Sequence, residues 1–580
     1  MNTSTFRRCL RTRLLPPLTV AICFLGCIWV ARAQSPVFAP DVNIDQTQLL
    51  SGKYPLRKVL ESGGQFFTTP FTPVDGMGEG AKGPRSAQRA AMYPANPSFP
   101  FLRVNGLDSQ SCYECHNSIG SYREPGTISN ALIRKPGTVS GSAGFNSDAF
   151  INADFPTPLT ELVRNPPHVF GTGYTQQLAS EMTFELQSYV QETQARARAK
   201  PGIEQTQPLT AKSTSFGVFK TIYDPVNKMF HDDYSGVVGV SSDLVVRPFQ
   251  WKGIASSIRH FVRDALDFHF SMQAVEKVGS KDCDQDGVVN EVSLGNLSAI
   301  VSFVTMTRPP DQEIPAGQEK KVQLGAQLFQ GKGSPRIATG QLCATCHTPS
   351  LKLDRAVLSI ENPPAVPPDA QCPTEANGKT PSLIDPVGKT EDLPVIHLFK
   401  LYQDKANATA LKQAKPGDTS HAATMAALQT AIKEPLSANL AYQINLTNPG
   451  PNVLTYTQPR LPAAPDGSVM VPLFSDLRTH DMGEGLKDPV PQGTDVQGIS
   501  VPPRLFLTRP LWGVADTGPW LHDGRARTLL EAIQLHLSDG SEANPVIQTF
   551  NQLNPDEQDA IVAFLLSLHL PLDPGVKAHN

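Results

Sequence analysis

The sequence predicts a mainly α-helical chain with long irregular loops, organised as two similar halves. Two observations indicate the halves: a five-residue cysteine motif occurs twice, and the segments around its two copies are alike. A third observation indicates the loops, because 52 prolines and 43 glycines in 580 residues interrupt regular elements often. Apolar residues make up 40% of the chain and charged residues 18%, so a packed core is expected and global disorder is excluded.

The first 33 residues have the pattern of an export signal. Four arginines and no acidic residue occupy positions 1–17, a nearly uncharged apolar run follows at 18–30, and 31–33 has the A-x-A form of a cleavage site. We therefore predict cleavage before Gln34, a periplasmic location, and no membrane span after signal removal. A membrane anchor is the weaker interpretation, because about 20 apolar residues are needed to span a bilayer.

The charge of the mature chain excludes a nucleic-acid role. Without the five arginines of the leader, 45 basic residues face 54 acidic ones, which gives a net charge of -9. Binding to nucleic acid requires a basic surface, so we expect no nucleic-acid partner. Six cysteines remain after cleavage, too few for a disulfide scaffold of this length.

Four of these six cysteines lie in the motif C-x-x-C-H, at 112–116 and again at 343–347. Two thiols on one short helical turn can each form a thioether to a haem vinyl group, and the histidine that follows is then held beneath the iron. A zinc knuckle would not require this histidine in both copies, and a redox dithiol would need a βαβ context that the sequence does not show. The sequence therefore predicts two covalently bound haem c groups. Attachment and proximal iron ligation are assigned to Cys112, Cys115, His116, Cys343, Cys346 and His347.

Amphipathic helices are predicted around the second motif. Residues 318–330, which precede it, and 555–568, near the end of the chain, place apolar side chains at helical spacing. The first and last helices of a c-type cytochrome cross at a close contact, which Gly325 would permit. We therefore expect two cytochrome c-type haem domains, at 96–310 and 311–580.

Two further segments lie outside this pattern. A Pro/Gly-rich extension at 34–95 is expected before the first haem domain. A large insertion at about 350–470 is expected in the second, where it could shape a substrate surface or a partner site.

An internal repeat extends the likeness of the two halves beyond the cysteine motif. The segment at Trp251 parallels the segment at His522, and in each a turn leads into a helix capped by Ser or Thr. Fourteen residues after His522 comes His536, whereas fourteen after Trp251 comes Ala265. The C-terminal iron can therefore take His536 as sixth ligand, while the N-terminal iron has no ligand from that position. A closed iron suits electron transfer, and an open one can bind peroxide or dioxygen.

Met482, His480 and His522 are the alternatives to His536 at the C-terminal iron. Met482 lies in Met-Gly-Glu-Gly, a sequence that also occurs at 77–80, so this motif could simply build a turn near each haem.

The chain resembles the dihaem oxidoreductases (thiol-oxidoreductase-like proteins), a branch of the dihaem cytochrome c peroxidase superfamily. The matching segments are 111–117, 164–167, 249–252, 480–483 and, most strongly, 510–529. The resemblance implies an N-terminal peroxidatic haem, a C-terminal haem that receives electrons, and between them a tryptophan, whose position Trp251 matches. In these peroxidases a methionine stands where His536 stands here, and an imidazole in place of a thioether should lower the potential of that haem.

The N-terminal haem pocket needs an acid–base group to move a proton between the two oxygens of peroxide. The resemblance implies a glutamate on the helix after the tryptophan, and Asp267, His269 and Ser271 lie near that place. We select His269 as the catalytic group, because imidazole titrates near neutral pH. It could instead bind the iron and close it, or be a solvated histidine, just as Trp251 could be a packed aromatic side chain and not a relay.

Arg259 and Arg263, on the same predicted helix, are interpreted as surface charges or as partners of a haem propionate.

An acidic loop at 282–291 has the D-x-D-x-D-G pattern of a calcium-binding loop. Alternate carboxylates and a central glycine can surround a hard cation with oxygen ligands. The candidate calcium ligands are Asp282, Asp284, Asp286, Val288 and Asn290. Position twelve of the pattern is Ser293 and not glutamate, and Glu291 could take its place; a solvated turn without an ion is the alternative. Cys283, in this loop, could pair with Cys372, in the insertion.

These observations favour an exported dihaem c-type oxidoreductase, a peroxidase-like enzyme that reduces peroxide at the N-terminal haem with electrons entering at the C-terminal haem. The expected partners are a small soluble electron donor, cytochrome- or cupredoxin-like, and a small-molecule oxidant. One alternative is a dihaem electron-transfer cytochrome with no catalysis. The other is an oxygenase or cofactor-modifying haem enzyme. The sequence does not separate peroxide from dioxygen or from a larger organic substrate.

Overall fold

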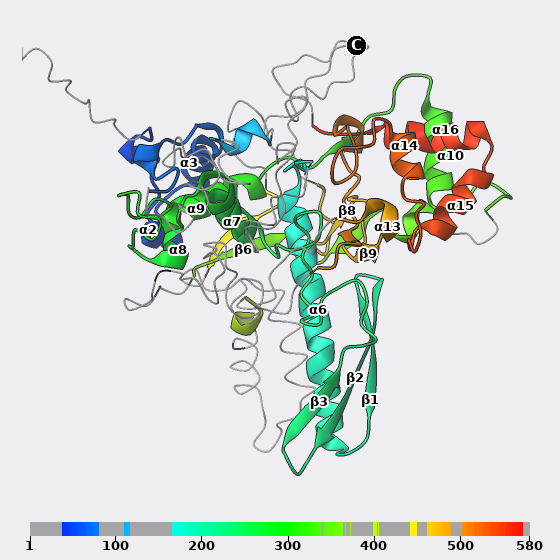
Figure 1. Ribbon diagram of the computed structural model, residues 1–580, viewed down its shortest axis with the longest axis horizontal. Coiled ribbons are helices and arrows are strands. Elements are labelled where there is room, and N and C mark those ends of the chain that lie inside the picture. The colour runs from blue at the N-terminus through cyan, green and yellow to red at the C-terminus, as the bar shows by residue number, and fades with distance from the viewer. Residues whose placement is uncertain are drawn as a thin grey trace, which may run out of the picture.

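The computed structural model describes residues 37–80, 110–116, 165–337, 342–363, 366, 372, 398–402, 404, 441–448, 461–488 and 501–571 (Figure 1). The predicted export signal, residues 117 and 164 of the family resemblance, and most of the insertion lie outside these ranges. None of the helices within them combines the length and the apolar composition that crossing a bilayer requires.

The described residues form a mixed α/β structure, which corrects the prediction of a mainly α chain. The α-helices are α2 (Gln46–Leu50), α3 (Leu56–Thr68), α6 (Thr172–Ala199), α7 (Ile258–Phe270), α8 (Val275–Val278), α9 (Leu294–Thr305), α10 (Glu319–Phe329), α13 (Gly483–Leu486), α14 (Leu529–Gln534), α15 (Asn544–Gln552) and α16 (Pro555–Leu565). Short 3-10 turns are η1 (Pro40–Val42), η2 (Pro73–Asp75), η3 (Cys112–Glu114), η4 (Cys343–Thr345) and η7 (Val514–Asp516).

The strands were not predicted from the sequence. An antiparallel sheet contains β1 (Gln205–Ala211), β2 (Thr214–Asp224) and β3 (Met229–Asp233). Two-stranded ladders join β4 (Asp311–Gln312) to β11 (Leu568–His569), β5 (Leu351–Leu353) to β8 (Val469–Val471), β6 (Val357–Glu361) to β7 (Ala441–Asn445), and β9 (Thr479–Asp481) to β10 (Leu505–Leu507). The larger sheet lies along the far half of α6 and projects away from the other helices (Figure 1). Phe216 and Phe219 of β2 are fully buried in the core that α6 shares with this sheet.

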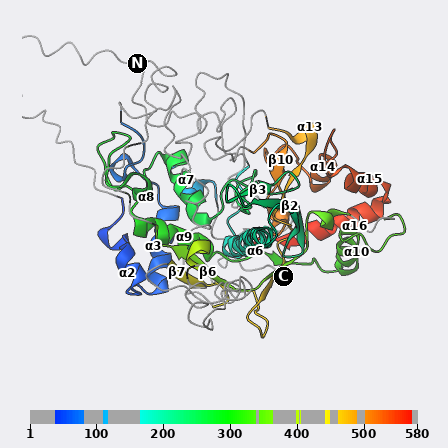
Figure 2. The same cartoon turned by 90° about the horizontal axis from the view of Figure 1, so that it is seen from below.

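Two groups of helices lie on either side of α6. Helices α2, α3, α7, α8 and α9 form one group, and α10, α14, α15 and α16 form the other (Figure 1). Figure 2, a view from below, shows α6 nearly end-on between them. Each group has its own apolar cluster. The cluster of the first group continues into the core between α6 and the three-stranded sheet.

Each group contains a close helix crossing at a glycine. A Cβ on Gly325 of α10 would collide with the backbone oxygen of Ala560 in α16, which confirms the predicted contact between these helices. A Cβ on Gly63 of α3 would collide in the same way with the backbone oxygen of Ala299 in α9. Helix α3, which lies in the segment expected as an extension, therefore occupies in the first half the place that α10 occupies in the second.

The predicted turn-and-helix repeat is present in both halves. Ser257 accepts a hydrogen bond from His260 N at the start of α7, and Thr528 accepts one from Glu531 N at the start of α14, both at 3.0 Å. The preceding turns are closed by isolated bridges, Phe249 with Ala255 and Trp520 with Ala526. The helices then differ in length, because α7 runs for 13 residues and α14 for 6. His536 therefore lies in the turn after α14, not on the helix itself.

Cys283 and Cys372 form a disulfide, with their Cα atoms 5.5 Å apart. The sequence-based expectation of this pair is confirmed, and the bond joins the acidic loop to the insertion.

Candidate functional site

Both C-x-x-C-H motifs form the same compact turn. In each, the histidine N–H donates to the carbonyl of the first cysteine, at 2.8 Å for His116 and 2.9 Å for His347. The imidazole Nδ1 of His116 lies 2.8 Å from Pro167 O, and that of His347 lies 3.1 Å from Phe474 O. Because a carbonyl oxygen only accepts, Nδ1 carries the proton and Nε2 carries the lone pair, which is the state of a metal-binding imidazole.

Burial keeps both of these imidazoles neutral. Desolvation lowers the pKa of His116 to about 4, against a weaker opposing effect of its hydrogen bond to Pro167. Desolvation, and next the charge of His536, lower the pKa of His347 to about 4. Neutral imidazole is the form that binds iron, so these histidines have the chemistry that the motif requires.

The second motif opens into a large, mostly apolar cavity. The space inside this cavity is about 1600 Å³ when the part open to solvent is counted. Its walls include Cys343, Cys346 and His347 of the motif, together with His536. Apolar walls, two thiols and two histidines are the donor set and surroundings that a c-type haem requires, so the residues present fit this cofactor.

His536 lies in this cavity, as predicted from the repeat. Its Nδ1 is 2.7 Å from the carbonyl oxygen of Ala532, one turn earlier, which leaves Nε2 as the ligand atom. Burial lowers the pKa of His536, so this imidazole is also neutral.

The three alternatives to His536 differ in whether they have a lone pair available for a metal. His480 has both nitrogens engaged, Nε2 at 2.9 Å from Asp476 Oδ2 and Nδ1 at 2.8 Å from Glu542 Oε2. Burial would lower the pKa of His480, but hydrogen bonds to Asp476, Cys346 and Glu542 outweigh it and raise the pKa to about 11. A charged imidazolium has no lone pair for iron. His522 Nε2 lies 3.4 Å from an oxygen of Asp488, whereas Met482 lines the cavity and stays an alternative.

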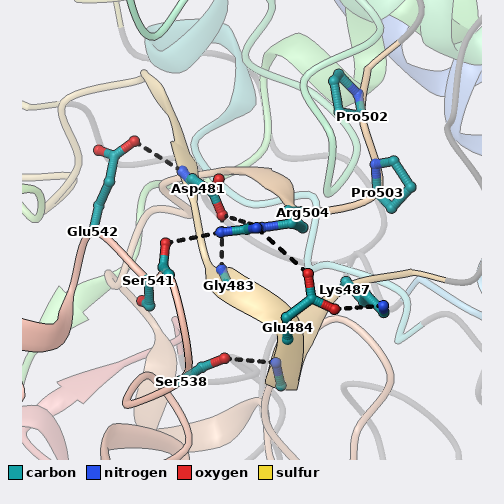
Figure 3. Close-up of polar contacts among 12 residues, drawn as sticks. Asp481, Gly483, Glu484, Lys487, Pro502, Pro503, Arg504, Ser538, Ser541 and Glu542 are labelled. Carbon is teal, nitrogen blue, oxygen red and sulfur yellow. Dashed lines mark hydrogen bonds and ion pairs between the residues drawn. The ribbon is translucent and has the colours of Figure 1, made fainter.

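The glycine-rich turn that contains Met482 is fixed by Arg504, which the sequence analysis missed (Figure 3). Arg504 Nε donates to Asp481 at 2.9 Å and Nη2 to the carbonyl of Gly540 at 3.0 Å. Glu484 N, in the same turn, donates at 3.0 Å to the carbonyl oxygen of Asp539, a residue that follows helix α14. The first copy of the Met-Gly-Glu-Gly motif, at 77–80, is likewise bonded to the end of a helix. Its Gly78 N donates to Phe270 O, at the end of α7, at 2.9 Å.

Trp251 lines the second cavity and contacts the first site. Its indole N–H donates to Asn165 O at 2.8 Å, two residues before the Pro167 that holds His116. On its other side the ring lies edge-on to His522, with 6.4 Å between centroids. The guanidinium of Arg509 lies 5.6 Å from the indole centroid.

The first motif opens into a smaller cavity of about 580 Å³, which shares Pro167, His168, Arg509 and Pro510 with the larger one. His269 is half-buried near the end of α7, one turn beyond Ala265 on the same face. A charge on His269 lowers the pKa of His116, but by less than burial or the hydrogen bond to Pro167 changes it. The two imidazoles therefore lie within electrostatic reach of each other.

Helix α7 contributes Ile258 and Phe261 to the lining of the first cavity, and His269 and the other candidates on this helix are not among the described residues that line it. Arg259 and Arg263 are buried, which corrects their interpretation as surface charges. Arg259 Nε donates to Glu276 at 2.8 Å, and Arg263 pairs with Asp264 at 3.1 Å. Asp267 and Ser271 are buried too, and Ser271 ends the helix in the left-handed conformation.

Three aspartates of the acidic loop come together as predicted. Carboxylate oxygens of Asp282, Asp284 and Asp286 lie within 4.8 Å of one another. Burial, and next the charge of Asp286, raise the pKa of Asp284 to about 9. Val288 is half-buried and Asn290 is exposed in the same loop.

Comparison with known families gives one match. Residues 457–568 match the model of the family described as "Di-haem oxidoreductase, putative peroxidase". This segment is therefore similar to the dihaem oxidoreductases. It contains His480, Met482, Trp520, His522 and His536, which all line the cavity at the second cysteine motif. Searches of the curated proteins and of the solved structures found no match. The resemblance stated from the sequence is thus confirmed in this segment, and a dihaem oxidoreductase uses haem as its cofactor.

Proposed function

We propose that this dihaem oxidoreductase is an exported, peroxidase-like enzyme with two covalently attached c-type haems. Peroxide is reduced at the N-terminal site with electrons that enter at the C-terminal site. The observation that carries the proposal is an asymmetry between matching positions. His536 lies in the second cavity, whereas the matching residue of the first half is Ala265, on a helix with the same cap.

The haem ligands follow from the two turns. Cys112, Cys115 and His116 would hold the first haem, and Cys343, Cys346 and His347 the second. Bound haem supplies one-electron redox chemistry and, where the iron has an open face, a binding place for a small oxidant.

The residues of the second site favour electron transfer. His536 is fixed through Nδ1 by Ala532 O, so its Nε2 is oriented before any cofactor binds. The walls of this site are mostly apolar, and a second imidazole would lower the potential relative to a thioether. A small soluble donor, cytochrome- or cupredoxin-like, would deliver electrons here.

Trp251 would pass electrons between the two sites. Its N–H is bound to the carbonyl of Asn165, and a carbonyl is not a base. The indole therefore keeps its proton while an electron passes, and no proton transfer has to accompany the relay.

His269 would serve as the acid–base group at the first site. Reducing one peroxide to two waters consumes two electrons and two protons, and a proton must move from one peroxide oxygen to the other before the O–O bond breaks. Position favours His269 over Asp267 and Ser271, because it is the half-buried member of the three.

Low-temperature EPR and peroxide turnover of the purified holoprotein, oxidised and half-reduced, test the proposal. We expect one high-spin and one low-spin ferric signal. Replacement of His269 by Gln should keep the high-spin signal and lower turnover by about 10²–10⁴-fold. His231→Gln, an exposed histidine of β3, is the matched control and should change neither.

Two low-spin signals in the oxidised protein, with the signal of the first haem still low-spin once the second haem is reduced, would contradict the proposal. If His269→Gln then converted one of them to high spin, His269 would be an iron ligand and the protein an electron-transfer cytochrome.

A further inference from the structure

The acidic loop between α8 and α9 places three carboxylates around one point. Oxygens of Asp282, Asp284 and Asp286 lie within 4.8 Å of one another. Gly287, at the centre of the loop, has φ +94°, a left-handed conformation that favours glycine. The N–H groups of Asp286 and Gly287 donate to the carboxylate of Asp282, at 3.2 and 3.1 Å, and so fix the first member of the set.

Asp284 is the member that points to a ligand. Its side chain is 0% exposed, and its Oδ2 has no hydrogen-bond partner among the described residues. Its other oxygen accepts a long contact of 3.4 Å from Asp286 N. A buried carboxylate oxygen without a partner is costly, and a bound cation would satisfy it.

Two further carboxylates add negative charge to this site. Glu79 is 6% exposed, and its charge acts on Asp284. Glu291 also acts electrostatically with Asp284, while its oxygens accept from Gln273 N at 2.7 Å and Gln273 Nε2 at 2.8 Å. The site thus collects five carboxylates, whose negative charge a divalent cation would partly offset.

We propose that this loop binds one Ca²⁺ through the carboxylates of Asp282, Asp284 and Asp286 and the backbone carbonyl of Val288. Oxygen ligands on a loop with a central glycine suit calcium, which accepts irregular geometry, better than magnesium, which requires a near-ideal octahedron. Ser293 does not act as the twelfth-position ligand, because its hydroxyl caps α9 by accepting from Asn296 N.

Hydrogen bonds connect the acidic loop to the C-terminal end of α7. Gly80 N donates to Asp284 O at 3.1 Å, and Gly78 N, two residues earlier, donates to Phe270 O at 2.9 Å. Cys283 N donates to Gln273 Oε1 at 2.9 Å. Calcium would therefore hold the end of the helix that carries His269, next to the first haem site. This consequence rests on the proposed function, whereas calcium binding itself does not.

Calorimetric titration of the holoprotein with CaCl₂, after treatment with a chelating resin, tests the proposal. We expect one site per chain. Asp284→Asn keeps the shape of the side chain and should weaken calcium binding by at least about 100-fold. Asp232→Asn removes the same charge from β3 and is the matched control, which should bind as the wild type does. Asp286→Asn is the second variant, in case the buried substitution impairs folding.

Three results would overturn the proposal: no binding to the wild-type protein, unchanged binding in both loop variants, or equal competition by MgCl₂ at the same concentration. EPR of the first haem gives an independent readout of the link to α7. Removal of calcium should alter that signal and leave the signal of the second haem unchanged. Calcium binding without this effect would overturn the link alone and leave the metal site standing.

Discussion

Helices α7 and α14 begin alike and end differently. Both follow a turn closed by a single bridge, and both are capped by a hydroxyl side chain. Helix α14 stops at Gln534, and the next turn carries His536 into the second cavity. Helix α7 continues through the matching position, where Ala265 stands, and places His269 one turn further on. One scaffold can therefore present a ligand to one iron and leave the other accessible, with a change in helix length and in one side chain.

Exchanging the two matching residues should have the largest effect. Replacing His536 by Ala should convert the low-spin signal of the second haem to high spin. Replacing Ala265 by His should convert the first haem to low spin and lower peroxide turnover by about 100-fold or more, equivalent to about 2.7 kcal/mol. EPR and steady-state assays measure both. If His536→Ala left the low-spin signal intact, Met482 would become the candidate ligand and the comparison would fail.

Replacing Trp251 by Phe should have a smaller effect. The indole and its hydrogen bond to Asn165 are lost, while an aromatic ring stays in the cavity. We expect electron transfer between the haems to slow by at least about tenfold, or about 1.4 kcal/mol of barrier. Stopped-flow reduction of the two haems measures this rate.

Trp520 offers the matched control for that experiment. It lines the same cavity, and its N–H also donates to a backbone carbonyl, that of Val514 at 2.9 Å. Equal slowing in Trp520→Phe would show that Trp251 acts through packing and not as a relay.

The two glycine crossings should respond least. Adding a methyl group at Gly63 or Gly325 forces the paired helices apart, which costs about 1–3 kcal/mol and is partly offset by a helix propensity gain of about 1 kcal/mol. The free energy of unfolding, followed by chemical denaturation, should fall by up to about 2 kcal/mol in each variant. Each variant is the other's control: Gly63→Ala should perturb only the first haem spectrum, and Gly325→Ala only the second.

Features that depend on short spacing could be predicted from the sequence. The cysteine turns and the hydroxyl caps follow from residues a few positions apart, and so does the apolar spacing of the two helices that meet at Gly325. The same apolar spacing exists around Gly63, with Leu60, Phe66 and Phe67 buried, but the Pro/Gly-rich composition of that segment concealed it. Strand β2 also carried a signal, because buried and exposed residues alternate at its start.

Other parts of the site arise from contacts between distant segments, and no local pattern reveals them. Lys252 is fully buried, and its Nζ lies 3.3 Å from Asp488, more than two hundred residues away. Arg504 binds the turn at Asp481 and the carbonyl of Gly540 together. In the sequence, such buried charged residues cannot be distinguished from charged residues at the surface. Their partners become known only from the tertiary structure.

The disulfide between Cys283 and Cys372 bears on how the chain matures. Joining cysteines 89 residues apart requires an oxidant. The four cysteines of the haem turns have the opposite need, because a thiol that has been oxidised cannot add to a vinyl group. A thiolate from either turn can also attack the Cys283–Cys372 bond and exchange with it. If haem is attached at both turns, two pairs of thiols would thus have to stay reduced while a third pair is oxidised in each newly made chain.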